Sequence, residues 1–264
     1  MWRAPAALWG LSISGHLASG GVSGNADCGL ESVSPFFHKQ LLPYRGTSRR
    51  ASHCQDIFVL EHLFPPYHRG VFVELGAADG LQDSNSYLLE KLGWSGVLIE
   101  AVESQAKACT LNRKAPCIHA CVSSTKEHLF RSVPHAPRLS GFAEHGEPVV
   151  CESLSDILRR QRVGRTVDVL FLDVEGSELD VLQSINLSRV QNLFVEMPPR
   201  NAKEFSFAEK QVKLNDGKDT GELRRYLASN GFRMVARFGL DLLYRRHGSL
   251  SAAPGALCDA DLLA

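Results

Sequence analysis

The sequence predicts an α/β protein built on a doubly wound, mostly parallel sheet with one antiparallel strand near its edge. Short apolar runs alternate with helix-like segments through most of the 264 residues. This alternation implies right-handed crossovers and a parallel sheet that is covered on both faces. The runs are apolar at consecutive positions, as strands buried on both faces require. The last two runs are separated by a turn so short that it can only join antiparallel strands.

The chain divides into three parts. Residues 1–50 contain many Gly and Ser and show no sustained periodicity, so we interpret them as a leader and linker. Residues 51–247 carry the alternating pattern and form the predicted domain. Residues 248–264 are expected to be a disordered tail. A hydrophobic content of 44% supports one sizeable core with tails.

Each element of the domain has its own pattern. In CQDIFVLEHLF, residues 54–64, apolar side chains recur at helical spacing, whereas VFVEL, residues 71–75, is a continuous strand-like run. Further helices are expected at 84–92, 103–112, 154–160, 178–185 and 221–230. Further strands are expected at 97–99, 117–122, 169–172 and 193–195, with a closing pair around Phe238-Gly239. The segments 133–148 and 198–219 are rich in Pro, Gly or charge, and we interpret most of their length as solvated loops. Both follow predicted strands, and sheets of this kind bind ligands in the crevice at the carboxyl ends of their strands.

The N-terminus predicts entry into the secretory pathway. MWRAPAALWGLSISGHLASG has one Arg, a short apolar stretch and small residues, and no acid precedes Asp27. This composition resembles a secretory signal peptide more than a membrane anchor. A mitochondrial transit peptide and a cytoplasmic tail are the alternatives. No run approaches the roughly 18 apolar residues of a membrane span.

The charge balance argues against a nucleic-acid partner, and the cysteine spacing argues against a bound zinc. The chain has 29 basic and 29 acidic residues, so no basic excess indicates a nucleic-acid partner. None of the seven cysteines forms a CxxC pair, which argues against a zinc knuckle. We expect Cys109, Cys117 and Cys121 to be buried apolar thiols.

The stretch GVFVELGAADGLQDSN, residues 70–85, predicts a nucleotide site that carries a carboxylate. A strand ends in Glu74, and a glycine turn follows. A dinucleotide turn needs G-x-G-x-x-G, of which only Gly76 is kept, and the Gly-Lys-Ser/Thr of a P-loop is absent. A carboxylate would repel a pyrophosphate but attract a cation. S-adenosylmethionine has a sulfonium, an ammonium and no phosphate, and Glu100, about 20 residues beyond the turn, is placed to accept hydrogen bonds from its ribose.

These stretches resemble the FkbM-family methyltransferases, a group of class I S-adenosylmethionine-dependent enzymes. The matching strings are CQDIFV, GVFVELGAADG, SNSYLLEKLGWSGVLIEA, VDVLFLDVEGSELDVL and LFVEM, which together span 54–197. The resemblance implies a Rossmann-like sheet and, as in many members, O-methylation of a hydroxyl-bearing acceptor, either a small molecule or a glycan. Some relatives are associated with trafficking or have no established activity, so a catalytically silent binding module is the alternative.

The resemblance also implies a set of cofactor contacts. Many methyltransferases have a polar or acidic adenine contact after the third strand, where this chain has HACVSS, residues 119–124. The adenine contact is therefore left open, and a backbone amide near Cys121 is one candidate for it. The other implied contacts are Glu74, Gly76, Ala77, Asp79, Gly80, Asn85, Glu100 and Ala101.

A second acidic cluster follows the strand at 169–172. Ser177 and Glu178 have the positions of an N-cap and a first-turn acid, which explains them structurally. Asp173 and Glu175 have no such explanation, and Glu196 ends the adjacent strand. We predict that Asp173 contacts the methionine end of the cofactor and orients the acceptor. Glu175 is predicted to contact the acceptor hydroxyl, either as general base or as a hydrogen-bond acceptor that aligns it. We predict no metal; magnesium held by two of these acids is the alternative.

Overall fold

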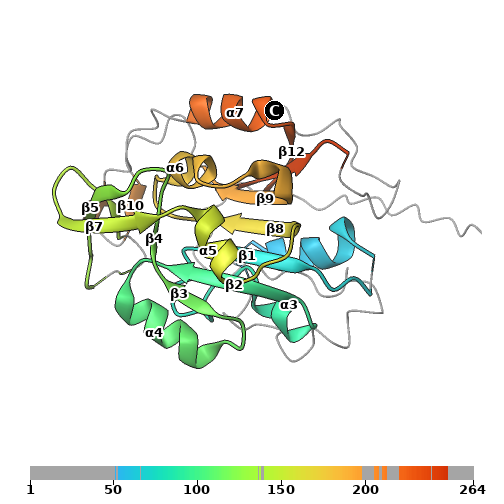
Figure 1. Ribbon diagram of the computed structural model, residues 1–264, viewed down its shortest axis with the longest axis horizontal. Coiled ribbons are helices and arrows are strands. Elements are labelled where there is room, and N and C mark those ends of the chain that lie inside the picture. Colours follow the sequence, from blue (N-terminus) through green and yellow to red (C-terminus); the bar gives the residue numbers. More distant parts are fainter. Residues whose placement is uncertain are drawn as a thin grey trace, which may run out of the picture.

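The structure, a computed structural model, describes residues 51–248 except for 52, 66, 136, 138–139, 198–204, 208–209, 213–219 and 239. Figure 1 shows the elements in chain order. The predicted leader lies outside the described residues, as do most of the predicted loop at 198–219 and all but the first residue of the predicted tail. The expectations for the leader and the tail therefore stay predictions.

Seven strands form the central sheet: β1 (Val71–Leu75), β2 (Ser95–Glu100), β3 (Cys117–His119), β8 (Val167–Leu172), β9 (Val190–Glu196), β12 (Phe232–Phe238) and β13 (Asp241–Arg246). Their spatial order is β12-β13-β9-β8-β1-β2-β3. Neighbouring strands are parallel except where β13 pairs with β9 and with β12. The antiparallel strand lies one place in from the edge, and the predicted fold class is confirmed.

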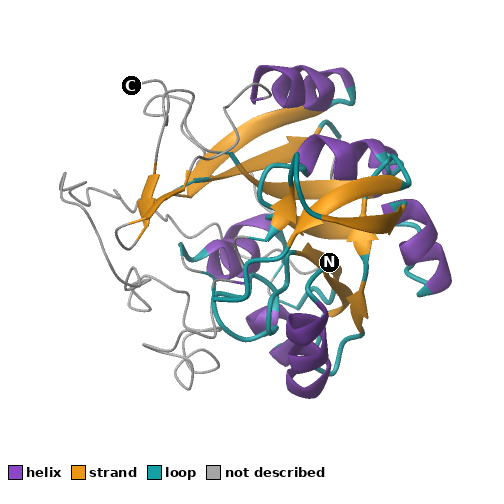
Figure 2. Ribbon diagram, turned by 90° about the vertical axis from the view of Figure 1, so that its left-hand side faces the viewer, coloured by secondary structure: helices purple, strands orange, loops and turns teal. Residues whose placement is uncertain are grey.

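Helices cover both faces of this sheet (Figure 2). One face carries α5 (Leu154–Arg160), α6 (Glu178–Gln183) and α7 (Thr220–Ser229). The other carries α2 (Gln55–Phe58), its π-helical continuation η3 (Val59–Leu63), α3 (Tyr87–Lys91) and α4 (Glu103–Asn112). Successive residues of β1 enter the two cores in turn, Phe72 on the α3 side and Val73 on the α5 side. Strands buried in this way are apolar on both faces. No helix within the described ranges is both long enough and apolar enough to cross a membrane.

A second sheet is inserted between β3 and α5. It consists of β4 (Cys121–Val122), β5 (Glu127–Arg131), β6 (Gly141–Phe142) and β7 (Glu147–Glu152), in the order β4-β7-β5-β6. The predicted loop at 133–148 is therefore wrong where it covers β6 and the start of β7. The predicted strand at 117–122 breaks at Ala120. Because β5 alternates exposed and half-buried residues, it lacks the continuous apolar run that reveals a central strand.

The predicted loop at 198–219 also contains strands. Here β10 (Phe205–Phe207) and β11 (Lys210–Val212) form an antiparallel pair. Each strand is only three residues long, too short for a periodic pattern to stand out.

Cysteines form disulfides rather than the apolar thiols that we expected. Cys109 of α4 is bonded to Cys117 of β3, and Cys121 of β4 to Cys151 of β7. Cys54 is also disulfide-bonded. The expectation was wrong because the pairing depends on strand register: Cys121 and Cys151 are direct neighbours across β4 and β7, which the sequence alone does not reveal.

Candidate active site

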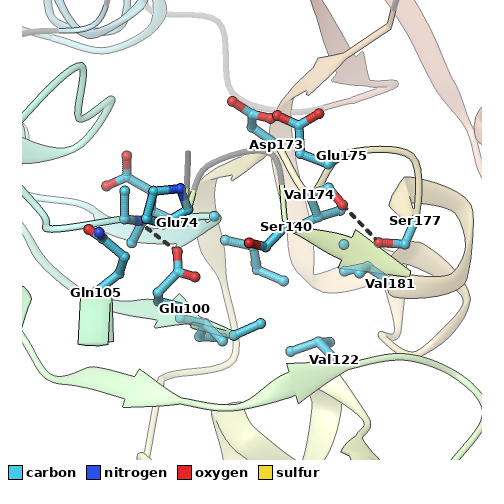
Figure 3. Close-up of a pocket in the computed structure, with 18 of the residues that line it drawn as sticks. Glu74, Glu100, Gln105, Val122, Ser140, Asp173, Val174, Glu175, Ser177 and Val181 are labelled. Carbon is cyan, nitrogen blue, oxygen red and sulfur yellow. Dashed lines mark hydrogen bonds between the residues drawn. The ribbon is translucent and has the colours of Figure 1, made fainter. Parts of the chain in front are cut away.

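A cavity of ≈ 780 Å³ lies at the carboxyl ends of β1, β2 and β8. The strand order reverses here, because the chain runs outward from β1 to β3 and then returns to β8 on the other side of β1. Ligands of doubly wound sheets bind at such a reversal. We call residues 76–86 the glycine loop; its residues 76–79 and 82–85 form one wall, and the inserted sheet forms another. Figure 3 shows Glu100 on one side of the cavity, with Asp173 and Glu175 on another.

Ten of the eleven predicted site residues line this cavity; only Gly80 does not. The ten are Glu74, Gly76, Ala77, Asp79, Asn85, Glu100, Ala101, Cys121, Asp173 and Glu175.

Both glycines of the turn are required by close packing, Gly76 against backbone and Gly80 against side chains. Gly76 has φ +76°, and a Cβ there would lie 1.7 Å from the main-chain oxygen of Asp173. Gly80 has φ +74°, and its Cβ would lie 2.8 Å from Cγ of Arg113 and 2.9 Å from Sγ of Cys109. The loop is thus wedged between the end of β8 and the end of α4, and no larger residue fits at either position.

Glu74 is buried, and its carboxylate is held by the glycine loop itself. It accepts hydrogen bonds from the main-chain N–H of Asn85 at 2.7 Å, from Oγ of Ser84 at 3.1 Å and from Oγ of Ser86. The guanidinium of Arg113 lies 3.8 Å away. Glu74 therefore orders the loop that lines the cavity. Attraction of a cationic cofactor, the role we predicted for it, is not needed to explain a carboxylate at this position.

Glu100 is oriented by two main-chain donors. Its carboxylate accepts from the N–H of Ala78 and from the N–H of Val102, both at 2.8 Å. Burial raises the pKa of Glu100, and these hydrogen bonds oppose that rise. A carboxylate oxygen has two lone pairs, so Glu100 retains acceptor capacity towards the cavity that it lines. Ala101 follows it, and the carbonyl oxygen of Ala101 lies 3.1 Å from Nε2 of His119.

Two further loop residues have distinct roles. Oδ1 of Asp79 accepts from the N–H of Leu81 at 2.9 Å and of Gln82 at 3.0 Å, so Asp79 shapes the turn. Oδ1 of Asn85 is buried without a hydrogen-bond partner in the described part of the chain. Since buried polar atoms are almost always paired, this oxygen is available to accept a hydrogen bond from a ligand.

Carboxyl groups gather where β8 and β9 end. Each of Asp173, Glu175 and Glu196 offers an oxygen that lies within 4.8 Å of those of the other two. Oxygens at this separation can share a proton, accept from a ligand, or hold a hard cation such as magnesium. Asp241 starts β13 directly opposite Glu196 and also lines the cavity. Sequence reasoning missed Asp241, because only the antiparallel pairing of β13 with β9 brings it here.

Crowding of these acids raises their pKa values. The pKa of Glu175 is raised to about 7 by burial, by the charge of Asp173 and by that of Glu178. The pKa of Asp241 is also raised to about 7 by burial and by the charge of Asp173, although a hydrogen bond from Gln55 lowers it in part. Burial and the neighbouring Asp173 raise the pKa of Glu196 further. Near neutral pH the cluster therefore contains both protonated and ionised carboxyls.

The start of α6 differs in detail from our prediction. Ser177 occupies the N-cap position, but its side chain caps no helical N–H; its Oγ donates to the carbonyl of Val174 at 3.0 Å. Glu178 instead folds back and accepts from the N–H of Gly176 at 3.0 Å. This local bonding explains Glu178 structurally, as expected, and leaves Glu175 facing the cavity in a left-handed conformation at φ +56°.

The inserted sheet supplies an aromatic wall that sequence reasoning missed. Phe130 of β5 and Phe142 of β6 are cross-strand neighbours, and both line the cavity. The ring of His128 stacks on Phe142 with a centroid separation of 3.9 Å. A Cβ on Gly141 would lie 3.4 Å from Cβ of Glu175, so this wall adjoins the acids. The only signal in the sequence was the position of this segment after a strand of the sheet.

Comparisons with known proteins identify one family. The profile of the methyltransferase FkbM domain matches residues 74–234, more than half of the chain. No curated protein matches the chain.

Similar solved structures include the magnesium protoporphyrin IX methyltransferase of Synechocystis with bound SAM, 12% identical over 68% of this chain and 71% of that chain, with a TM-score of 0.36. The FkbM methyltransferase of Methylobacillus flagellatus is 16% identical over 67% of this chain and 43% of that chain, with a TM-score of 0.38. A SAM-dependent methyltransferase from Aquifex aeolicus is 14% identical over 71% of this chain and 92% of that chain, with a TM-score of 0.33. These scores are low, so the family is assigned from the domain profile.

Proposed function

Because the chain belongs to the FkbM family of methyltransferases, we propose that it transfers the methyl group of S-adenosylmethionine to a hydroxyl oxygen of its acceptor. The position of Glu175 carries this proposal. Its carboxyl lies in the cavity, and its pKa is raised to about 7 by burial and by Asp173 and Glu178. A carboxyl whose pKa lies near the working pH is suited to act as general base.

The cofactor is S-adenosylmethionine, and the chemistry of the cavity suits it. Glu100 is held with acceptor capacity towards the cavity, which suits the two hydroxyls of a ribose. The unpaired Oδ1 of Asn85 suits an ammonium donor. Asp173 supplies negative charge at the carboxyl end of β8. A volume of ≈ 780 Å³ is within the roughly 300–1,000 Å³ of small-molecule sites and leaves room for an acceptor.

Two residues of the acidic cluster, Glu175 and Asp173, have different roles in the proposed reaction. When bound, the cofactor supplies an electrophilic methyl carbon. Glu175 would accept the proton of the acceptor hydroxyl, and the bound cofactor would supply the methyl group to that oxygen and leave as the neutral thioether. Asp173 orients the acceptor by accepting a hydrogen bond. Most of the acceleration comes from this alignment, and proton removal adds a factor of about 10²–10⁴.

The acceptor that we propose is a small molecule or a glycan that carries several hydroxyls. Carboxyl oxygens accept hydrogen bonds from hydroxyls, and the cavity presents them from Asp173, Glu175 and Glu196. The adjoining Phe130 and Phe142 offer an apolar surface to the body of such a molecule.

The site of action that we propose is the secretory pathway. Two disulfides lie within the described chain, Cys109–Cys117 and Cys121–Cys151. Structural disulfides persist in oxidising compartments and are rare in the cytosol. Together with the acid-free N-terminus they support cleavage of the leader before about residue 28. N-terminal sequencing of the mature protein tests this, and recovery of Met1 from a cytosolic fraction contradicts it.

Calorimetric titration tests the proposed function. Binding heat is expected with S-adenosylmethionine and none with NAD; heat with NAD alone, or with neither, overturns the cofactor assignment. Transfer of a labelled methyl group to a panel of sugars and small hydroxylated molecules then tests the acceptor. Labelling of amines only would overturn O-methylation. Cofactor binding without transfer to any acceptor would favour the silent binding module.

A further inference from the structure

A buried arginine lies directly behind the glycine loop. Arg113 follows the last residue of α4, and its side chain has no exposed surface. Its Nε donates to Glu90 at 2.7 Å, which balances its charge. The guanidinium also lies over the rings of Phe72 and Tyr87, 5.8 and 5.6 Å from their centroids. Arg113 does not line the cavity, so it contacts neither cofactor nor acceptor.

The guanidinium of Arg113 ties the loop together at three places. Nη1 donates to the carbonyl of Gly80 and to Oγ of Ser84, both at 3.0 Å, and Nη2 donates to Oγ of Ser86 at 2.9 Å. Only a planar group with several fixed donors makes all these contacts at once. A lysine ammonium would reach at most part of them.

The two serines connect Arg113 to Glu74. Each hydroxyl accepts from Arg113, and Ser84 and Ser86 each donate their single proton to the carboxylate of Glu74. Glu74 also accepts from the N–H of Asn85. The single proton of each serine and four of the five N–H groups of Arg113 are used, so the loop is held in one bonded arrangement.

The end of α4 holds Arg113 in place. The disulfide between Cys109 and Cys117 brackets it in the sequence. Nδ2 of Asn112 donates to the carbonyl of Asp79 at 2.9 Å, a further bond from α4 to the loop. The network is therefore anchored on a fixed element and not on the loop alone.

We propose that Arg113 is a positioning residue for the cofactor, a role that rests on the proposed function. It fixes the glycine loop so that Ala78 holds Glu100 and Asn85 presents its unpaired Oδ1 before the cofactor arrives. Without Arg113, binding has to order the loop, and this ordering lowers affinity. Arg113 bonds the loop within residues 80–86 and not at Gly76, where the loop packs against Asp173, so turnover at saturating cofactor should change little.

The test compares Arg113→Lys with Arg189→Lys. Arg189, in the 3₁₀ turn η5 (Leu187–Arg189), also clamps a loop through its guanidinium, by donating to the carbonyls of Val163 and Gly164 at 3.2 and 2.6 Å. It lies outside the cavity. Arg113→Lys should raise the Kd and KM for S-adenosylmethionine about 10- to 100-fold, with kcat at saturation within about twofold. Arg189→Lys should leave all three constants unchanged.

Hydrogen exchange gives a readout without cofactor. Amides of residues 76–86 should exchange faster in Arg113→Lys than in the wild type, while those of β8 should not. Equal affinity in Arg113→Lys and the wild type overturns the proposal, as does an equal loss of affinity in Arg189→Lys. If Arg113→Lys does not fold, Ser86→Ala decides: weakened binding supports the proposal and unchanged binding overturns it. If the wild type itself does not bind S-adenosylmethionine, the proposed function fails instead.

Discussion

Gly76 and Asp173 are packed backbone against backbone at the point where the two halves of the sheet meet. A Cβ on Gly76 would lie 1.7 Å from the carbonyl oxygen of Asp173, and Gly76 has φ +76°. The glycine loop and the acidic cluster are therefore fixed relative to each other by main-chain contact. A change at Gly76 will disturb both.

Gly76→Val should abolish cofactor binding and lower the melting temperature. The branched side chain would collide with the backbone after β8 and would be strained at positive φ. Gly164→Ala is the matched control, because a Cβ there meets no atom within 4 Å. Calorimetry with S-adenosylmethionine and thermal unfolding measure the two effects. Normal binding by Gly76→Val would mean that the loop does not hold the cofactor.

Glu100→Ala should weaken cofactor binding by about 1.5–3 kcal/mol, the range for hydrogen bonds to a charged group. The carboxylate also holds the N–H groups of Ala78 and Val102, so part of the loss comes from the freed loop. Glu103→Ala, which removes an exposed acid from the first turn of α4, should have no effect. Unchanged affinity in Glu100→Ala, measured by calorimetry, would remove this residue from the site.

Glu175→Gln should lower turnover by about 10²–10⁴ and leave cofactor affinity nearly unchanged. A base must be ionised to accept a proton, so the wild-type rate should rise with pH through about 7, where burial and the adjacent acids set the pKa of Glu175. This acid limb should be absent from the variant. Asp173→Asn should impair binding and turnover together.

A chelator distinguishes the base from a metal ligand. EDTA should leave the wild-type rate unchanged if Glu175 acts as a base. Loss of activity with EDTA and recovery with magnesium would make Asp173 and Glu175 ligands instead. Full turnover by Glu175→Gln with a true acceptor would reduce this carboxylate to a structural residue.

The acidic cluster should make the protein less stable as pH rises. Folding raises the pKa of Asp241 from 3.8 to about 7, through burial and the charge of Asp173. Between these values the folded state keeps a proton that the unfolded state has lost, so stability falls across this window and levels off above it. Asp241→Asn keeps an acceptor for Gln55 and should raise the melting temperature more at pH 8 than at pH 4. An equal change at both pH values would contradict the shift.

The inner strands of the central sheet were predictable because they are buried on both faces. The expected ranges 71–75, 103–112 and 154–160 agree with β1, α4 and α5 to the residue. Continuous apolar runs and helix-forming segments are determined by local sequence. The inserted sheet was not predictable in this way, since β5 has only one half-buried face.

The site was predictable in part for the same reason. Glu100 and Asp173 end or follow apolar strands, and the carboxyl ends of parallel strands meet at one edge. Arg113 and Asp241 could not be found from the sequence. Arg113 reaches the glycine loop from the end of α4. Asp241 reaches the acidic cluster through the pairing of β13 with β9. Contacts between segments distant in the chain leave no local pattern.

The disulfides Cys121–Cys151 and Cys109–Cys117 close loops of different length and should contribute unequally to stability. Cys121 and Cys151 are separated by 30 residues, whereas Cys109 and Cys117 are separated by 8. In the loop-entropy model the longer loop contributes about 1 kcal/mol more than the shorter one to the free energy of unfolding. Replacing Cys121 and Cys151 with Ser should therefore cost more in urea denaturation than replacing the other pair. Equal losses would show that local packing, and not loop length, determines both contributions.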